Sequence, residues 1–89
     1  MRQRYLVEGE VQGVGYRYFA VARARQVGVC GWVRNLPDGR VEAVAEGTAA
    51  ALAEFEGWLK RGPTVAVVTN VHVLETSDEA EVLTSFIIR

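Results

Sequence analysis

The sequence predicts an α+β fold in which two helices cover one face of a mainly antiparallel sheet. Two stretches with helical spacing of apolar residues alternate with short strand-like segments, so the elements follow the order β-α-β-β-α-β with one further strand at the end. Glycine or proline stands at most of the boundaries. Right-handed crossovers in this order place both helices on the same face. The predicted architecture is a ferredoxin-like sandwich.

The first strand and the first helix are separated by a short glycine loop. Residues 3–11 alternate in polarity as a half-buried strand does, and Gly13 and Gly15 follow them. The helix is predicted over residues 16–27, a stretch rich in alanine and in long side chains. Gly28 is expected to end this helix in a left-handed conformation. One face of the helix carries the residues Tyr16, Ala20, Ala24 and Val27.

A β-hairpin is predicted next. Residues 29–35 form a short apolar strand, and residues 36–39, with the sequence LPDG, are a turn signal. Residues 40–46 form the second strand of the hairpin, because apolar and polar positions alternate along them. Val41, Ala43 and Ala45 stand on one face of that strand, opposite Arg40, Glu42, Val44 and Glu46.

The second half of the chain repeats the pattern of helix and strand. Thr48 is expected to cap a helix that runs to about Arg61, where Gly62 and Pro63 stop it. Its inward face carries Leu52, Phe55 and Leu59. The valines of residues 64–76 do not keep one parity, so this strand is expected to contain a bulge near residues 68–70. A polar turn over residues 77–81 and a last strand over residues 82–89 complete the prediction.

Composition bounds the possible functions. With 89 residues, of which 49% are hydrophobic, the chain is large enough for one core, and we expect a single domain over residues 1–89. The net charge of -1 gives no reason to expect nucleic acid or an anionic membrane as a partner. The first ten residues lack the apolar stretch of a signal peptide, and no apolar run is long enough to span a bilayer, so a cytoplasmic location is expected.

The single cysteine and the single histidine restrict the chemistry further. Cys30 cannot form an internal disulfide, and together with His72 it cannot supply a Cys/His metal site. Cys30 is expected to be a small buried residue, and His72 an exposed strand residue rather than a base. Trp32 and Trp58 are expected to pack in the fold, because neither has an aromatic neighbour at the spacing of a stacking platform.

The stretch VQGVGYR, residues 11–17, places a cation at the start of a helix. A helix N-terminus favours anions, so Arg17 is locally unfavourable there. The loop is neither a dinucleotide fingerprint, since Tyr18 stands where the third glycine is needed, nor a P-loop, since it lacks Gly-Lys-Ser/Thr. Backbone N–H groups from about Val14 to Arg17 can nevertheless converge on one anion, and Arg17 can add a bidentate contact. Alternatively, the glycines only shape a turn and Arg17 lies along the surface.

Asn35 is a second candidate for the site. It leaves its strand at the start of the predicted turn, where an asparagine commonly bonds its own backbone. A neutral amide at this place can instead hold a water molecule, because it both donates and accepts hydrogen bonds.

The sequence resembles the acylphosphatase family over essentially the whole chain. Residues 7–17 are similar to the first signature of the family, and residues 31–35 with Gly39, Val41 and Gly47 match the spacing of the second. The resemblance implies metal-independent hydrolysis of acyl phosphates to a carboxylate and inorganic phosphate, with water attacking phosphorus and without a cofactor. It further implies a five-stranded ferredoxin-like sandwich.

The same resemblance implies the roles of individual residues. Arg17 clamps the phosphoryl oxygens and Asn35 positions the attacking water. The phosphoryl group is held by backbone N–H groups of Gln12, Gly13, Val14, Gly15, Tyr16 and Arg17. Tyr16 stands where the family usually has phenylalanine or methionine, and its hydroxyl therefore needs a partner if the ring is buried.

Domains of this fold also have functions other than hydrolysis. An RNA-recognition motif is disfavoured, because residues 40–47 carry no aromatic side chain on the central strand. A phosphate sensor, or a domain that passes carbamoyl phosphate to a partner, is harder to exclude. The chain ends at Arg89, which favours a free-standing enzyme acting on a small-molecule acyl phosphate, and nothing in the sequence demands more than a monomer. Dependence of turnover on Asn35 separates an enzyme from a sensor, since a sensor has no use for a positioned water. Nothing in the sequence defines the acyl group.

Overall fold

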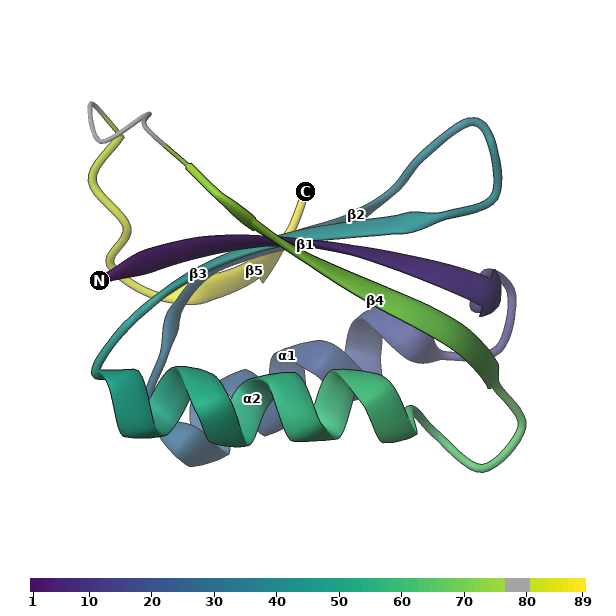
Figure 1. Cartoon of the computed structure of the whole chain (residues 1–89), viewed down its shortest axis with the longest axis horizontal. Helices are drawn as coiled ribbons and strands as arrows, with labels where there is room; N and C mark the ends of the chain where they lie inside the picture. Colours follow the sequence, from purple (N-terminus) through teal and green to yellow (C-terminus); the bar gives the residue numbers. More distant parts are fainter. Residues whose placement is uncertain (77–80) are drawn as a thin grey trace.

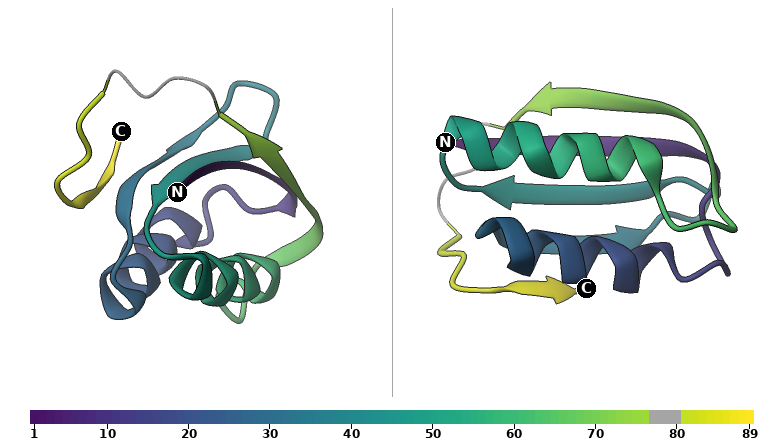
Figure 2. Two further views of the ribbon diagram at one scale, coloured as in Figure 1. Left: turned by 60° about the vertical axis from the view of Figure 1, so that its left-hand side comes forward. Right: turned by 90° about the horizontal axis from the view of Figure 1, so that it is seen from below.

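The computed structural model describes residues 1–76 and 81–89, which form a five-stranded sheet covered by two helices on one face (Figure 1). The strand order is β4-β1-β3-β2-β5, and only the β2–β5 pair is parallel among the described strands. This arrangement confirms the predicted ferredoxin-like order, and Figure 2 shows both helices side by side beneath the sheet. The elements are β1 (Arg2–Glu10), α1 (Tyr16–Val27), β2 (Cys30–Asn35), β3 (Val41–Glu46), α2 (Ala49–Arg61), β4 (Val67–Glu75) and β5 (Phe86–Ile88).

Both helices begin and end where the sequence predicts. Helix α1 ends at Gly28, whose φ of 86° is left-handed and whose N–H donates to the carbonyl oxygen of Ala24. Helix α2 begins after Thr48, whose hydroxyl oxygen accepts a hydrogen bond of 3.1 Å from the N–H of Ala51. Neither helix of the described part has the length and apolar content needed to cross a membrane.

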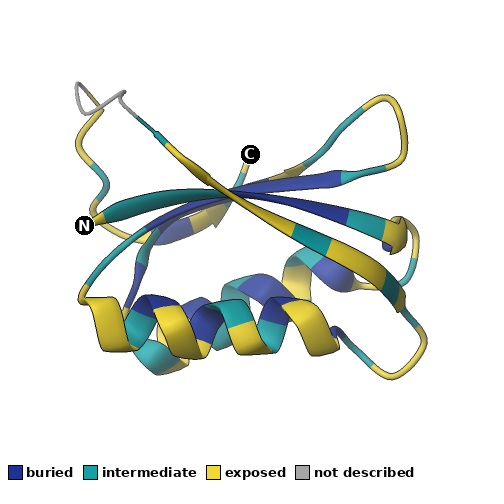
Figure 3. Ribbon diagram, in the orientation of Figure 1, coloured by how far each residue is buried: buried dark blue, intermediate teal, exposed yellow. Residues whose placement is uncertain are grey.

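The core lies between the helices and the sheet (Figure 3). Phe55 of α2 is completely buried and makes edge-to-face contacts with Tyr5, at 5.8 Å between ring centroids, and with Phe86, at 5.4 Å. Each of these rings comes from a different element, so this contact ties α2 to the first and the last strand. The predicted inward residues Tyr16, Ala20, Ala24, Leu52, Phe55 and Leu59 are all buried, and Val27 packs against them.

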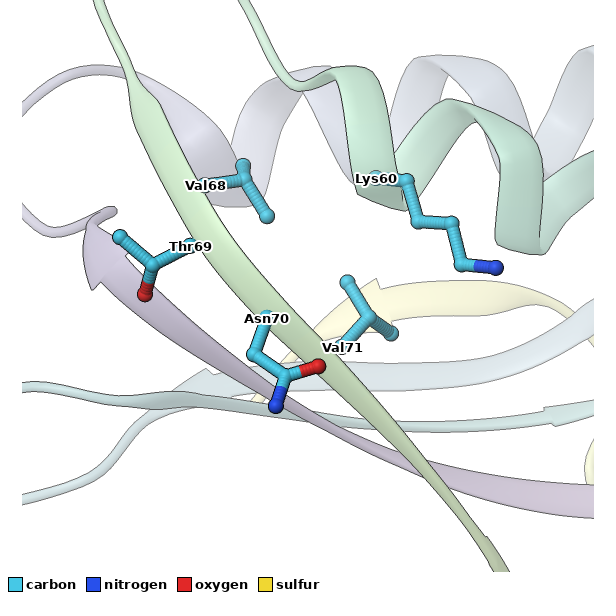
Figure 4. A pocket seen from close by; sticks show the side chains of 5 residues that line it. All are labelled: Lys60, Val68, Thr69, Asn70 and Val71. Carbon is cyan, nitrogen blue, oxygen red and sulfur yellow. The ribbon is translucent and has the colours of Figure 1, made fainter.

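The predicted bulge lies in β4. Glu8 pairs with Asn70, but the next residue of β1, Gly9, pairs with Val68, so Thr69 is the extra residue. Val68 and Val71 are therefore both on the side of the strand that faces α2, although they are three positions apart (Figure 4). The bulge explains why the valines of this strand do not alternate.

The C-terminal strand is shorter than expected. We predicted a strand over residues 82–89, whereas β5 comprises only Phe86–Ile88. Phe86 is buried and pairs with Gly31, while Val82 is 82% exposed and precedes the paired segment. Hydrophobic composition alone suggested a longer strand, but only β2 is available as a partner for it. The predicted polar turn over residues 77–81 lies outside the described residues except for Glu81. Cys30, expected to be buried, is half-buried at the start of β2.

The face of the sheet opposite the helices carries a buried carboxylate. Glu42 of β3 is only 3% exposed, although the alternation along β3 predicted a solvent-facing position. It accepts hydrogen bonds of 2.5 Å from Nε of Arg4 and 2.6 Å from Nε of Arg34. Burial alone would raise the pKa of the Glu42 carboxyl, but the hydrogen bonds from the two arginines outweigh it and hold this pKa below its ordinary value of 4.5.

Replacement of Glu42 with glutamine is expected to lower the free energy of unfolding at pH 7 by about 1–3 kcal/mol, because two arginines lose their shared carboxylate. Since the pKa of Glu42 is lowered in the folded chain, its contribution is complete above pH 4.5 and is lost as the pH falls through the folded-state pKa. Urea unfolding of both proteins at pH 7 and at pH 3 measures this. A difference between them that is as large at pH 3 as at pH 7 would contradict the assignment.

Candidate active site

Strands β1 and β2 finish at the end of the sheet where α1 begins (Figure 1). A pocket lies there. It has a volume of about 210 Å³. The glycine loop, residues 11–17, provides one wall, and the last residue of β2 provides another. The residues that line it are Val11, Gly13, Gly15, Tyr16, Arg17, Tyr18 and Asn35.

The two glycines give the loop its shape. Gly13 and Gly15 have φ values of 74° and 79°, a left-handed conformation that residues with a Cβ rarely adopt. Gly15 stands directly before α1, and its carbonyl oxygen accepts the first helical hydrogen bond, 3.0 Å from the N–H of Phe19. Within the described residues, the N–H groups of Tyr16, Arg17 and Tyr18 therefore have no backbone acceptor. They are available to an anion.

Arg17 lies beside these N–H groups and is half-buried. No acidic side chain and no carbonyl of residues 1–76 or 81–89 pairs with its guanidinium. A partly buried cation at a helix N-terminus without a partner is unfavourable in the empty chain. An anion in the pocket would supply the missing partner.

Asn35 lines the same pocket and carries an unsatisfied acceptor. Its Oδ1 atom is buried and has no hydrogen-bond partner in the part of the chain that the structure describes. Buried side-chain oxygens are nearly always bonded, so an orphan acceptor calls for an external donor. A water molecule is such a donor, whereas a phosphate oxygen without a proton is not.

The structure brings together most of the predicted site residues, but not all. Gly13, Gly15, Tyr16, Arg17 and Asn35 line the pocket, as described above. Val14 does not line it and packs against the core, and the exposed side chain of Gln12 turns to the β2–β3 turn instead. Sequence reasoning missed Val11 and Tyr18, whose only signal was their position directly beside the loop and beside Arg17.

The hydroxyl of Tyr16 has the partner that its burial requires. It donates a hydrogen bond of 2.8 Å to the carbonyl oxygen of Leu59 in the last turn of α2. In a continuous helix this carbonyl would accept from the N–H of residue 63, but that residue is Pro63, which has none. Burial raises the pKa of the Tyr16 hydroxyl above its usual range, so it remains a donor at physiological pH.

Replacement of Tyr16 with phenylalanine is expected to reduce the free energy of unfolding by about 1–3 kcal/mol, because it leaves the carbonyl of Leu59 buried without a donor. Tyr18→Phe is the matched control, since Tyr18 is 73% exposed and its hydroxyl is in water. Chemical denaturation of the three proteins measures the difference. Equal stability of Tyr16→Phe and wild type would mean that the bond to Leu59 is not stabilising.

Two other candidate groups lie away from this pocket. The pocket in Figure 4, between α2 and β4, also has a volume of about 210 Å³, but the ammonium of Lys60 on its rim already pairs with Glu56 at 2.9 Å. His72 is exposed on β4, as predicted, with its Nε2 atom 3.2 Å from a carboxylate oxygen of Glu8. It does not line the pocket of Arg17 and Asn35.

Comparison with known proteins shows which family this chain resembles. The Acylphosphatase family model matches residues 3–88. An acylphosphatase from Synechococcus sp. (strain WH7803) is 57% identical over 70 residues, which make up 79% of this chain and 70% of that protein. A crystal structure of T.kodakarensis HypF matches 100% of this chain with a TM-score of 0.84 and 30% identity, and this match covers 12% of that chain. The crystal structure of acylphosphatase from Bacillus subtilis matches with a TM-score of 0.92 and 41% identity, covering 99% of this chain and 97% of that one. Since the family model and a solved acylphosphatase both match nearly the whole chain, this protein belongs to the acylphosphatase family.

Proposed function

We propose that this protein hydrolyses acyl phosphates to a carboxylate and inorganic phosphate, as an acylphosphatase. One observation carries the proposal. Asn35, whose buried Oδ1 atom has no hydrogen-bond partner among the described residues, lines the same pocket as Arg17, next to the free N–H groups at the start of α1. The pocket thus combines a place for an anion with a place for a water molecule.

The glycine loop and Arg17 bind the phosphoryl group in this proposal. The helix N-terminus supplies N–H donors, and the guanidinium supplies two parallel donors in a fixed fork. Together they stabilise charge on the phosphoryl oxygens as the bond to the acyl group breaks. The residues assigned to phosphate binding are Gln12, Gly13, Val14, Gly15, Tyr16 and Arg17, with Gln12 and Val14 contributing only through the backbone.

Asn35 holds the attacking water. The Oδ1 atom accepts one hydrogen of the water and thereby directs an oxygen lone pair toward phosphorus. A bond forms between the water oxygen and phosphorus, and the bond between phosphorus and the acyl oxygen breaks with its electron pair remaining on the carboxylate. The proton of the water passes to a phosphoryl oxygen of the substrate. No side chain has to act as a base.

The leaving group explains why so few side chains suffice. A carboxylate, whose conjugate acid has a pKa of roughly 4–5, departs at neutral pH without protonation by a general acid. A loose phosphoryl transfer needs mainly positioning and charge stabilisation. Arg17 and the loop supply the charge stabilisation, and Asn35 supplies the positioning, so the proposed reaction requires no metal and no cofactor.

Hydrolysis of benzoyl phosphate by the purified protein in the presence of EDTA tests the proposal. We expect fast release of benzoate and phosphate at the same rate with and without EDTA. Binding of phosphate without any turnover would instead assign the protein to phosphate sensors. Turnover that EDTA abolishes would overturn the metal-free mechanism.

The proposal extends to the number of domains, the oligomeric state, the location and the partners of the protein. We take the chain to be one acylphosphatase domain that acts as a monomer in the cytoplasm, with no nucleic acid and no membrane as a partner. The match of the family model to residues 3–88 and the single core cluster of the described residues support one domain. Light scattering measures the oligomeric state. A domain that passes carbamoyl phosphate to a partner is the alternative, and hydrolysis by the isolated chain distinguishes the two.

A further inference from the structure

The side chain of Gln12 joins the glycine loop to the β2–β3 turn. Its Nε2 group donates one hydrogen bond of 2.8 Å to the carbonyl oxygen of Leu36 and another of 2.9 Å to that of Arg40. Both amide hydrogens are therefore used, and both acceptors are backbone atoms of the turn. Among the described residues, no other side-chain hydrogen bond connects the glycine loop with this turn.

The two acceptors of Gln12 also define the turn itself. The N–H of Leu36 donates to the carbonyl of Arg40 at 2.8 Å, and the N–H of Gly39 donates to the carbonyl of Leu36 at 3.2 Å. A carbonyl oxygen has two lone pairs, so each accepts one bond from the turn and one from Gln12. The Gln12 amide thus holds the two ends of the turn, Leu36 and Arg40, and Leu36 directly follows Asn35.

We propose that Gln12 is a positioning residue that sets the distance between the phosphoryl group and the water held by Asn35. This inference rests on the proposed function. The glycine loop carries the donors for the phosphoryl group, while Asn35 carries the acceptor for the water, and the two belong to separate segments. Leu36 follows Asn35 directly, so a shift of the turn relative to the loop moves the amide of Asn35 relative to Arg17.

The position of Gln12 predicts which kinetic parameter changes. Loss of its two bonds leaves Arg17 and the N–H donors of α1 in place, so affinity for phosphate should be maintained. The water, however, is held less accurately, and misplacement by about 1 Å lowers a rate by on the order of 10²-fold. A residue that only stabilises the fold would not separate kcat from phosphate affinity in this way.

The first test compares Gln12→Met, which retains the length of the side chain without donors, with Gln26→Ala. Gln26 is a suitable control, because it is an exposed amide on α1 whose side chain only accepts a bond of 2.8 Å from Arg23. We expect Gln12→Met to lower kcat for benzoyl phosphate by roughly 10- to 100-fold, with a competitive inhibition constant for phosphate within about 2-fold of wild type. Gln26→Ala should have the same kcat and the same inhibition constant for phosphate as wild type. If Gln12→Met does not fold, Gln12→Asn, whose shorter amide cannot reach both carbonyls, replaces it.

The second test places Gln12→Met in the Asn35→Ala background. If Gln12 acts through Asn35, it should cause no further loss of kcat once Asn35 is gone, so the two changes are strongly non-additive. A full additional loss in that background would overturn the inference. A loss of phosphate affinity as large as the loss of kcat would also overturn it, because Gln12 would then shape the phosphate site itself.

A measurement independent of turnover separates this inference from the proposed function. The side-chain amide of Asn35 gives a pair of ¹H–¹⁵N resonances that are assigned by their absence in Asn35→Ala. We expect them to shift in Gln12→Met and to stay in place in Gln26→Ala. If wild type does not hydrolyse benzoyl phosphate, the proposed function fails, yet these shifts still decide whether Gln12 positions Asn35. Unmoved resonances in Gln12→Met would refute the positioning role.

Discussion

Arg17→Ala is expected to lower kcat/KM for benzoyl phosphate by on the order of 10³-fold, the effect typical of removing an arginine that stabilises a phosphoryl transition state. Inhibition by inorganic phosphate should weaken as well, because in the proposed mechanism the same guanidinium contacts both the substrate and phosphate. Stability should not fall. Within the described residues Arg17 has no partner to lose, and removal of a cation from the start of α1 relieves a few tenths to about 1 kcal/mol. Kinetics and urea unfolding of the same variant measure both effects.

Arg17→Lys is the matched control for charge. Lysine retains the positive charge but cannot offer two parallel donors, so it should restore part of the phosphate affinity and little of the turnover. Near-normal turnover of Arg17→Ala would show that the N–H groups alone are sufficient.

Asn35→Ala is expected to lower kcat by on the order of 10²-fold or more while leaving inhibition by phosphate nearly unchanged. In the proposed mechanism, the acceptor that it removes contacts the water and not the phosphoryl group. The folded state should not suffer, since Oδ1 of Asn35 is buried without a partner among the described residues and its loss removes a desolvation cost. Steady-state kinetics with phosphate as a competitive inhibitor provide both parameters.

Asn70→Ala serves as the control for this change. Asn70 is an exposed residue of β4 that does not line the pocket of Asn35. Its Nδ2 atom lies 3.4 Å from Nε2 of His72. Its loss should leave kcat and phosphate inhibition as in wild type. Full turnover by Asn35→Ala would refute the assignment of the water to Asn35, even if Arg17→Ala behaved as expected.

Local patterns were sufficient to predict the order of the elements and most of the residues that line the candidate pocket. Gly13, Gly15 and Arg17 formed a pattern that is costly unless an anion binds there, and the irregular valines of β4 indicated the bulge. Other features depend on contacts between distant segments. The burial of Glu42 arises because β3 is a central strand flanked by arginines of β1 and β2, which no alternation pattern contains.

The side-chain contacts around the site were likewise beyond local patterns. Gln12 bonds a turn that lies 24 and 28 positions later in the chain, and Tyr16 donates to a carbonyl 43 positions away. Such contacts can be predicted only when the fold is already known. The length of β5 likewise depends on its pairing with Gly31, Trp32 and Val33 of β2, which the hydrophobicity of residues 82–89 does not reveal.

The position of β1 within the sheet has a consequence for how the chain acquires its activity during synthesis. Both neighbours of β1 are made later, and β4, on its outer side, emerges only after residue 67. The glycine loop follows β1 directly and is anchored by it. On the side where β4 will pair, β1 has no partner until β4 has left the ribosome. Pairing over such sequence separations slows folding and favours an all-or-none transition. Nascent chains that stop before β4 are therefore expected to lack a working site.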